Sequence, residues 1–214
     1  MNILAPLRDK LVLSAAGANF MTGLVGNVSI PTYDGSTVGW AGEVDAAADG
    51  AGTFGEVELS PKRLTAYVDI SKQFLIQDSV SAEALLRKDI VDAISNKLEA
   101  TILGAEAGST TKPAGLFNAV VADEADITYK DIVAMEQKLE EANVSGNITF
   151  IASPYAKATL KTTAIGGTKS DVRMLMESGE VDGYPVLVTN GMAKKGLILG
   201  NFNDLVIGQW GGID

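Results

Sequence analysis

The stretch EVELSPKRLTAYVDIS, residues 56–71, decides the fold of this chain because apolar and polar side chains alternate on both sides of Pro61. Val57 and Leu59 alternate with acidic and polar residues before the proline, and the apolar residues within 64–70 do the same after it. A period of two residues predicts long half-buried strands. A proline inside such a run predicts an edge or a bulge at that point.

The residues before this stretch predict the other half of a hairpin. Residues 14–55 are rich in Gly and Ala and contain one short strand candidate, Asn27–Pro31. We therefore expect a long hairpin arm with a glycine-rich tip. An isolated two-stranded hairpin is only marginally stable in water, so this arm is expected to lie on something outside its own domain.

The clearest helix of the sequence spans residues 79–104. Its stripe of helical spacing consists of Leu86, Ile90, Ala93, Ile94, Lys97 and Leu98. At 1.5 Å per residue such a helix would be about 37 Å long, well above the average length in globular proteins. We expect it to serve as a backbone for other elements.

The second half of the chain mixes shorter helices and strands. Thr128 is a candidate N-cap for a helix from Tyr129 to about Asn143, and Ser153 followed by Pro154 predicts a helix through Leu160. Residues 104–118 read as a loop by composition. Short buried strands are predicted at Asn147–Ala152, Tyr184–Thr189, Gly196–Gly200 and Leu205–Gln209. Because helices and strands intermix without a regular βαβ alternation, the predicted fold class is α+β.

The composition excludes most catalytic chemistry. The 214 residues include no Cys and no His, which removes disulfides, thiolate and histidine metal sites, and nucleophiles that depend on either residue. Lys and Arg number 17 against 27 Asp and Glu, a formal charge of -10. No basic excess is available to neutralise phosphates, so sequence-specific nucleic-acid binding is not expected. We predict no enzyme activity, no cofactor and no metal.

Two motifs that could carry chemistry are interpreted as structural. Residues 165–170, IGGTKS, lack the spacing of a phosphate-binding loop and read as a flexible turn. Glu136, Glu140 and Glu141 share one predicted helix without calcium-loop spacing, which is typical of a solvated acidic face. A carboxylate-dependent hydrolase would need one exposed and one buried carboxylate in a recognisable pair, and no such motif is present.

The start of the sequence does not resemble a targeting signal. Residues 1–13 mix proline and charged residues into the apolar ones, and no run approaches 18 apolar residues. We therefore expect no membrane contact. An adhesin or a surface-layer module is disfavoured for the same reason.

A series of motifs, taken in order, resembles the tailed-phage major capsid protein family, whose shell fold is shared with encapsulins. Residues 40–78 have an aromatic residue and a Glu before a loop, then TFGEVELSPKRL and VDIS. The later motifs are Leu85-Leu86 near the start of the long helix, KPAGLFN at 112–118, GYPV at 183–186 and LGNF at 199–202. Each motif is weak alone, but together they cover most of the chain from Leu7 to Gly212.

The resemblance implies a phage major-capsid-like fold with an extended β-hairpin arm, a peripheral domain with the long helix, and an axial domain. The implied boundaries are an N-terminal region at 1–32, the arm at 33–67, the peripheral domain at 68–128, the axial domain at 129–206, and a truncated return to the peripheral domain at 207–214. Since family members normally continue with further strands, we expect this chain to be a fragment or a truncated product.

The function implied by the resemblance is structural. Hexamers and pentamers of the chain would tile an icosahedral phage or prophage capsid around packaged double-stranded DNA, assembled in the cytoplasm of a bacterial host. Its partners would be other copies of itself, with a scaffold, a maturation protease and a portal as further candidates. The alternative is an encapsulin-like nanocompartment shell around a cargo enzyme.

The predicted contacts between subunits lie on the arm and on a loop of the axial domain. These candidates are Trp40, Phe54, Lys62, Arg63, Lys161 and Lys169. Some family members form a covalent crosslink through a lysine of the arm, but Glu56 stands at the corresponding position here. Lys62 and Lys72 do not match that position, so no such crosslink is predicted.

Overall fold

The structure is a computed structural model that describes residues 11–43, 46, 49–69, 81–119, 126–166 and 173–211. The chain divides into two compact units. The larger draws on residues up to Phe20 and on Lys62–Ile207, and the smaller on Met21–Pro61 and Gly208–Gly211.

A five-stranded sheet forms the centre of the larger unit, in the order β5-β6-β7-β4-β8. Its strands are β4 (Ile148–Ala152), β5 (Met176–Glu177), β6 (Glu180–Val181), β7 (Tyr184–Val188) and β8 (Leu197–Asn201). Strand β4 pairs in parallel with β7 and antiparallel with β8. A mixed sheet with helices between its strands confirms the predicted α+β class.

Strand β4 supplies both hydrophobic cores of this unit because successive side chains of a strand point to opposite faces. Phe150 belongs to a cluster on one face and Ile151 to a cluster on the other, and both are fully buried. The neighbouring strands keep the same register, since Phe150 lies opposite Val186 and Leu199. Those two residues also pack against the Phe150 cluster.

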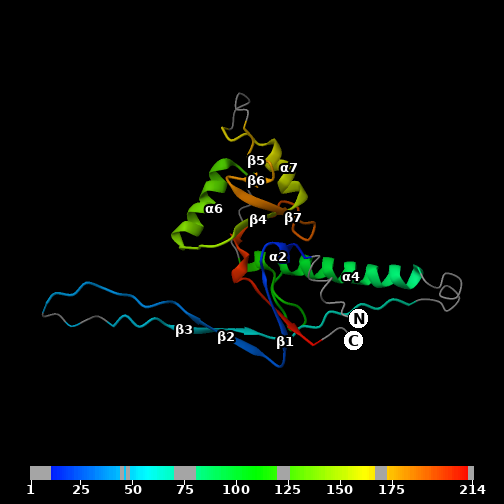
Figure 1. Cartoon of the computed structure of the whole chain (residues 1–214), viewed down its shortest axis with the longest axis horizontal. Coiled ribbons are helices and arrows are strands. Elements are labelled where there is room, and N and C mark those ends of the chain that lie inside the picture. Colours follow the sequence, from blue (N-terminus) through cyan, green and yellow to red (C-terminus); the bar gives the residue numbers. More distant parts are fainter. Residues whose placement is uncertain are drawn as a thin grey trace. The chain divides into compact units, whose positions relative to one another are not determined.

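Two helices cover the Phe150 face of the sheet (Figure 1). Helix α6 (Tyr129–Glu141) contributes Ile132 and helix α7 (Pro154–Thr162) contributes Leu160. Both begin where the sequence predicts: the Asp131 carboxylate accepts hydrogen bonds from the backbone N–H and the hydroxyl of Thr128, and Ser153 Oγ accepts one from Ala156 N at 3.1 Å. Helix α6 ends two residues earlier than predicted and α7 two residues later.

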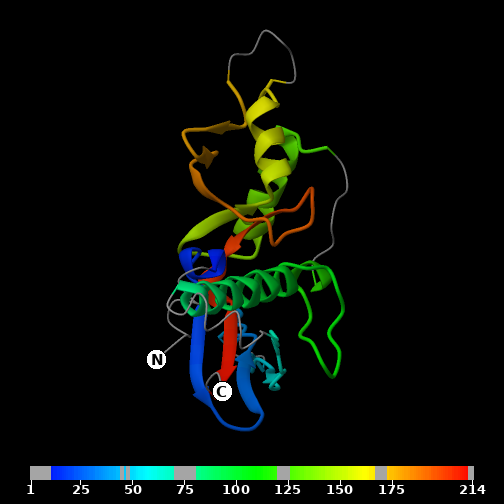
Figure 2. The ribbon, with the colours of Figure 1, turned by 90° about the vertical axis from the view of Figure 1, so that its right-hand side faces the viewer.

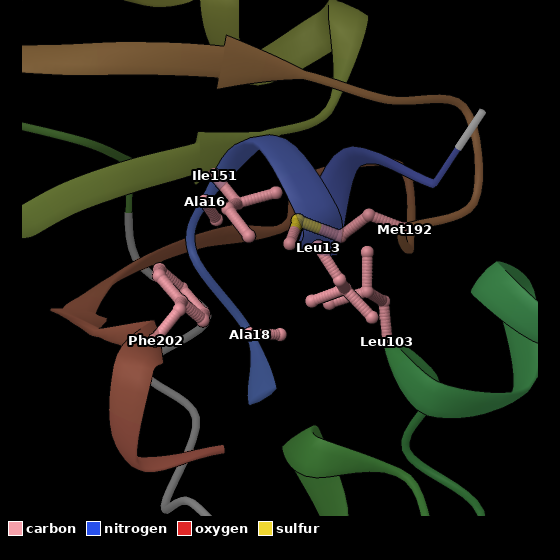
Figure 3. Packing of buried hydrophobic residues seen from close by; sticks show 7 residues of the cluster. All are labelled: Leu13, Ala16, Ala18, Leu103, Ile151, Met192 and Phe202. Carbon is pink, nitrogen blue, oxygen red and sulfur yellow. The ribbon is translucent and has the colours of Figure 1, made fainter. Parts of the chain in front are cut away.

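The Ile151 face is covered by segments from distant parts of the sequence (Figure 3). A short helix, α2 (Val12–Ala15), contributes Leu13, and Leu103 follows the long helix α4 (Ser81–Ile102). The side chains of Leu13, Met192 and Leu103 point toward one another in Figure 3. Phe202, in the 3-10 helix η1 (Phe202–Asp204), completes this cluster near β4.

Helix α4 confirms the long predicted helix, with a length of about 33 Å at 1.5 Å per residue. Its inner face differs from the predicted stripe: Ala93 and Lys97 are exposed, while Ser95 and Glu99 are buried. At the C-terminal end of the helix, Ile102 and Leu103 pack into the core, and Gly191 lies against Glu99, which accounts for the burial of Glu99.

Glu99 is an unusual residue for this helix. Its side chain is only 7% exposed, and its Oε1 atom has no hydrogen-bond partner among the described residues. The close approach depends on Gly191, because a Cβ atom there would lie 2.8 Å from Glu99 Cγ. A buried polar atom without a partner costs stability whatever its ionisation state.

Replacing Glu99 with methionine is therefore expected to raise the free energy of unfolding by about 1–3 kcal/mol, the cost of an unsatisfied buried polar group. Methionine has a similar length and is a good helix former. Chemical denaturation of the two proteins would measure the change. Glu140→Met, at an exposed position of α6, is the matched control and should change stability by less than about 0.5 kcal/mol. A loss of stability in Glu99→Met would show that the carboxylate has a partner in the folded chain.

The smaller unit contains the predicted hairpin, formed by β2 (Val28–Tyr33) and β3 (Phe54–Leu59). A second two-stranded sheet pairs β1 (Asn19–Leu24) with β9 (Val206–Trp210). These two strands lie side by side in Figure 2, in blue and red. The domain boundaries expected from the resemblance stay a prediction.

The structure contradicts the predicted strand after Pro61. Residues 61–69 have no regular secondary structure and are all exposed, and Ile70 lies outside the described residues. Val57 in β3 is exposed as well, so the prediction of half-buried strands was wrong there. Conversely, the predicted loop 104–118 contains the start of the short helix α5 (Leu116–Ala119).

Candidate interaction surfaces

The hairpin β2–β3 presents two faces of different chemistry. Its antiparallel register places Val28 opposite Leu59 and Ile30 opposite Val57, and residues directly opposite each other share a face of a sheet. We call Val28, Ile30, Val57 and Leu59 the apolar face. The other face, which we call the polar face, consists of Ser29, Pro31, Tyr33, Phe54, Glu56 and Glu58.

Hydrogen bonds across the strands hold the acidic residues of the polar face. Asn27 Nδ2 donates to Glu58 Oε1 at 2.6 Å, and Ser29 Oγ donates to Glu56 Oε2 at 2.8 Å. Both carboxylates remain exposed. Glu56 stands at the position where some members of the resembled family carry a crosslinking lysine. Here its carboxylate takes part in hydrogen bonding within the hairpin.

An aromatic pair lies on the polar face where β2 ends and β3 begins. The rings of Tyr33 and Phe54 have centroids 4.6 Å apart. The Tyr33 hydroxyl lies 2.6 Å from Ser36 Oγ and accepts a hydrogen bond from Gly52 N at 3.2 Å. These two hydrogen bonds, that with Ser36 first, lower the pKa of Tyr33 from its ordinary value. The pairing continues beyond the strands, where Thr53 Oγ1 donates to Asp34 Oδ2 at 2.8 Å.

The smaller unit has no core of its own among its described residues. None of the described residues in 21–61 is fully buried, and none belongs to either hydrophobic cluster. Large apolar side chains are instead exposed, namely Val25, Tyr33, Val38, Trp40, Phe54 and Val57. Exposed large apolar side chains of this kind make the smaller unit a candidate interaction surface.

The candidate contact residues fall in different parts of the chain. Trp40 is fully exposed in the segment between β2 and β3, and Phe54 is 82% exposed at the start of β3. Lys62 and Arg63 are exposed, and Lys62 Nζ donates to Thr110 O at 3.4 Å. Lys161 is exposed near the end of α7.

Lys169 lies outside the described residues, as does Lys72. The role of all these side chains as contacts stays a prediction. Sequence reasoning did not single out Val28 and Ile30. Their alternation with Ser29 and Pro31 is visible in the sequence but does not reveal that both side chains are only partly buried.

The acidic helix α6 shows no arrangement for metal binding. Glu136 Oε1 accepts a hydrogen bond from the Tyr184 hydroxyl at 2.9 Å, which raises the pKa of Tyr184. Within the described residues, no group of three or more Asp or Glu side chains is placed to hold a metal ion.

A hollow of about 290 Å³ lies on the surface, and its lining includes Tyr129, Arg173, Glu177 and Asp182. Among the helices that the structure describes, none is long and apolar enough to span a membrane.

The known proteins that are similar to this chain in sequence are capsid proteins of phages. The family described as "Phage capsid family" matches residues 1–214 of this chain. A major capsid protein of Halomonas phage phiHAP-1 is 27% identical over 97% of this chain and 35% of its own length. A major capsid protein of Klebsiella oxytoca phage phiKO2 is 25% identical over 96% of this chain and 53% of its own length. The chain thus spans about a third to a half of the length of these curated relatives.

Solved structures share the fold at lower sequence identity. A chain of Microbacterium phage Oxtober96 has a TM-score of 0.69 and 15% identity over 91% of this chain and 71% of that chain. A chain from the capsid of an empty GTA particle has a TM-score of 0.67 and 19% identity over 88% of this chain and 72% of that one. At these identities the likeness establishes the fold.

Proposed function

Because this chain belongs to the phage capsid family along its whole length, we propose that it is the shell-forming part of a major capsid protein. Copies of it would associate into hexamers and pentamers and tile an icosahedral shell around packaged double-stranded DNA. The capsid fold and the names of the two curated relatives support this role. The work of such a protein is done by its interfaces, without catalysis.

One observation carries the proposal: the hairpin contributes to neither core among the described residues, and its apolar face leaves Val57 51% exposed and Val28, Ile30 and Leu59 only partly buried. A two-stranded hairpin of this length gains too little from its own pairing to stay ordered in water. Burying Val28, Ile30, Val57 and Leu59 against another surface would stabilise it. In a shell, every copy offers such a surface to a neighbour.

The partner of the apolar face is therefore another copy of the chain. Trp40 and Phe54 would add exposed aromatic area, a residue type enriched where interfaces carry most of their binding energy. Lys62, Arg63, Lys161 and Lys169 would lie at the rims, where charges govern association rate and register more than affinity. A scaffold, a maturation protease and a portal would be further partners during assembly in the host cytoplasm.

The negative net charge of the chain is compatible with a shell that encloses DNA without binding it tightly. A net charge of -10 favours release of DNA from the inner wall over tight binding, since phosphates attract basic surfaces. Both curated relatives are phage proteins, which favours the phage role over an encapsulin-like compartment.

Assembly in solution tests the proposed function. We expect light scattering on size-exclusion fractions to show particles whose mass rises with protein concentration, and negative-stain images to show rings or closed shells. Because the curated relatives are longer, a second polypeptide should carry any coding sequence contiguous with this one. If both polypeptides remain monomeric up to high concentration, with and without co-expressed neighbouring genes, the shell role is contradicted.

A further inference from the structure

The C-terminal end of β9 is joined to the turn before the hairpin by a tryptophan. Trp210 Nε1 donates a hydrogen bond to Gly26 O at 2.6 Å. Gly26 lies in the turn between β1 and β2 and has a positive φ of +69°, and Gly23, near the end of β1, has a positive φ of +75°. All of these residues belong to the smaller unit.

Gly208 provides the seat for this tryptophan. A Cβ atom at Gly208 would lie 2.8 Å from Cη2 and Cζ3 of Trp210 and 3.1 Å from Cδ1 of Leu24. The six-membered ring of the indole therefore lies directly over the backbone of Gly208, beside Leu24. The backbone of Gly208 does not have a positive φ, so the position needs glycine for space rather than for conformation.

The link matters because the β1–β9 sheet and the β2–β3 sheet share no hydrogen-bonded ladder among the described strands. Strand β1 pairs with β9, and β2 pairs with β3. The chain passes from one sheet to the other through residues 25–27, which contain one of the two glycines with positive φ. A turn of this kind has many accessible conformations when nothing fixes it.

We propose that Trp210, seated on Gly208 and bonded to Gly26, is a latch that fixes the base of the hairpin to β9. Trp210 is then a positioning residue: it holds the β1–β2 turn in one conformation, so that the apolar face of the hairpin is ordered before it meets a partner. Ordering a binding element in advance removes that entropy cost from association. This positioning role rests on the proposed function, whereas the latch itself does not.

The latch can be measured in the unassembled protein. In a Trp40→Phe background Trp210 is the remaining tryptophan, and its partly buried ring should be shielded from acrylamide quenching. Gly208→Ala should displace the ring and raise the quenching constant about twofold or more. Gly200→Ala in β8 is the matched control, because a Cβ there meets nothing within 4 Å, and it should leave quenching unchanged. Equal quenching in Gly208→Ala and its parent would overturn the latch.

Hydrogen exchange tests the hydrogen bond separately from the seat. Trp210→Phe keeps an aromatic ring but removes the N–H donor. We expect amide exchange in residues 24–28 to become about fivefold faster, as the loss of one hydrogen bond implies, while α6 and α7 keep their exchange rates. Unchanged exchange at the turn, or equal acceleration throughout the chain, would contradict a local latch.

Assembly of proteins that retain Trp40 then tests the positioning role. Trp210→Phe and Gly208→Ala should assemble about fivefold less readily than the parent and than Gly200→Ala. A disturbed latch with unchanged assembly would contradict the positioning role while leaving the latch established. If the parent itself does not assemble, the shell function fails, and quenching and exchange still decide whether the latch exists.

Discussion

Replacing Phe150 with alanine is expected to lower the free energy of unfolding of the larger unit by about 3–5 kcal/mol, the usual cost of deleting a buried phenyl ring. Phe150 is fully buried in β4. Its ring meets that of Tyr184 edge to face, with centroids 6.2 Å apart. It also packs in the cluster that holds Ile132 of α6 and Leu160 of α7 against the sheet. Chemical denaturation followed by far-ultraviolet circular dichroism would measure the loss.

The matched control removes the same ring from the other unit. Phe54 is 82% exposed and contacts Tyr33 on the polar face of the hairpin. Phe54→Ala should change the stability of the larger unit by less than about 0.5 kcal/mol, as is usual for surface substitutions. Similar losses in the two variants would mean that the hairpin and the sheet unfold together and that the cores do not belong to the larger unit alone.

The parts of the fold predicted correctly from sequence are those fixed by local chemistry. Thr128 and Ser153 mark helix starts because their side chains lie at the first turns of α6 and α7. Strand β4 is an apolar run with strands on both sides, and such runs are recognisable when both faces are buried.

The parts predicted wrongly depend on partners that no local pattern reveals. Residues 64–69 alternate like a half-buried strand, yet they are exposed and unpaired into any described sheet. Alternation records that a segment can bury one face, not which surface covers it. Glu99 is buried in α4 for a related reason: the loop at Gly191 contacts the helix at Glu99 and Ala100, and the sequence of the helix alone does not predict this contact.

The sequence predicted the hairpin, whereas the role of its side chains as contacts stays a prediction. The hairpin and the exposed aromatics Trp40 and Phe54 followed from the glycine-rich sequence and the resemblance. The apolar face required the register between β2 and β3, since a shift by one residue would exchange the two faces. Trp210 was not singled out because its partners, Gly26 and Gly208, acquire meaning only once β9 and the turn lie together.

Replacing Val57 with lysine is expected to raise the protein concentration needed for assembly by about tenfold to a hundredfold or more. Burying a valine side chain is worth about 1.5–3 kcal/mol, and each 1.4 kcal/mol corresponds to a factor of ten in affinity. A lysine at this position would also bring an unpaired charge into the contact, which adds to the cost. The fold should survive, because Val57 is 51% exposed and belongs to neither core.

The opposite face of the hairpin supplies the control for this experiment. Ser29→Lys adds the same side chain on the polar face, next to Glu56, whose carboxylate can pair with it. Light scattering across a concentration series should show near-parental assembly for Ser29→Lys and a large defect for Val57→Lys. Equal defects would mean that any added charge on the hairpin disturbs assembly. A defect confined to Ser29→Lys would assign the contact to the polar face, and the exposed apolar side chains would then need another explanation.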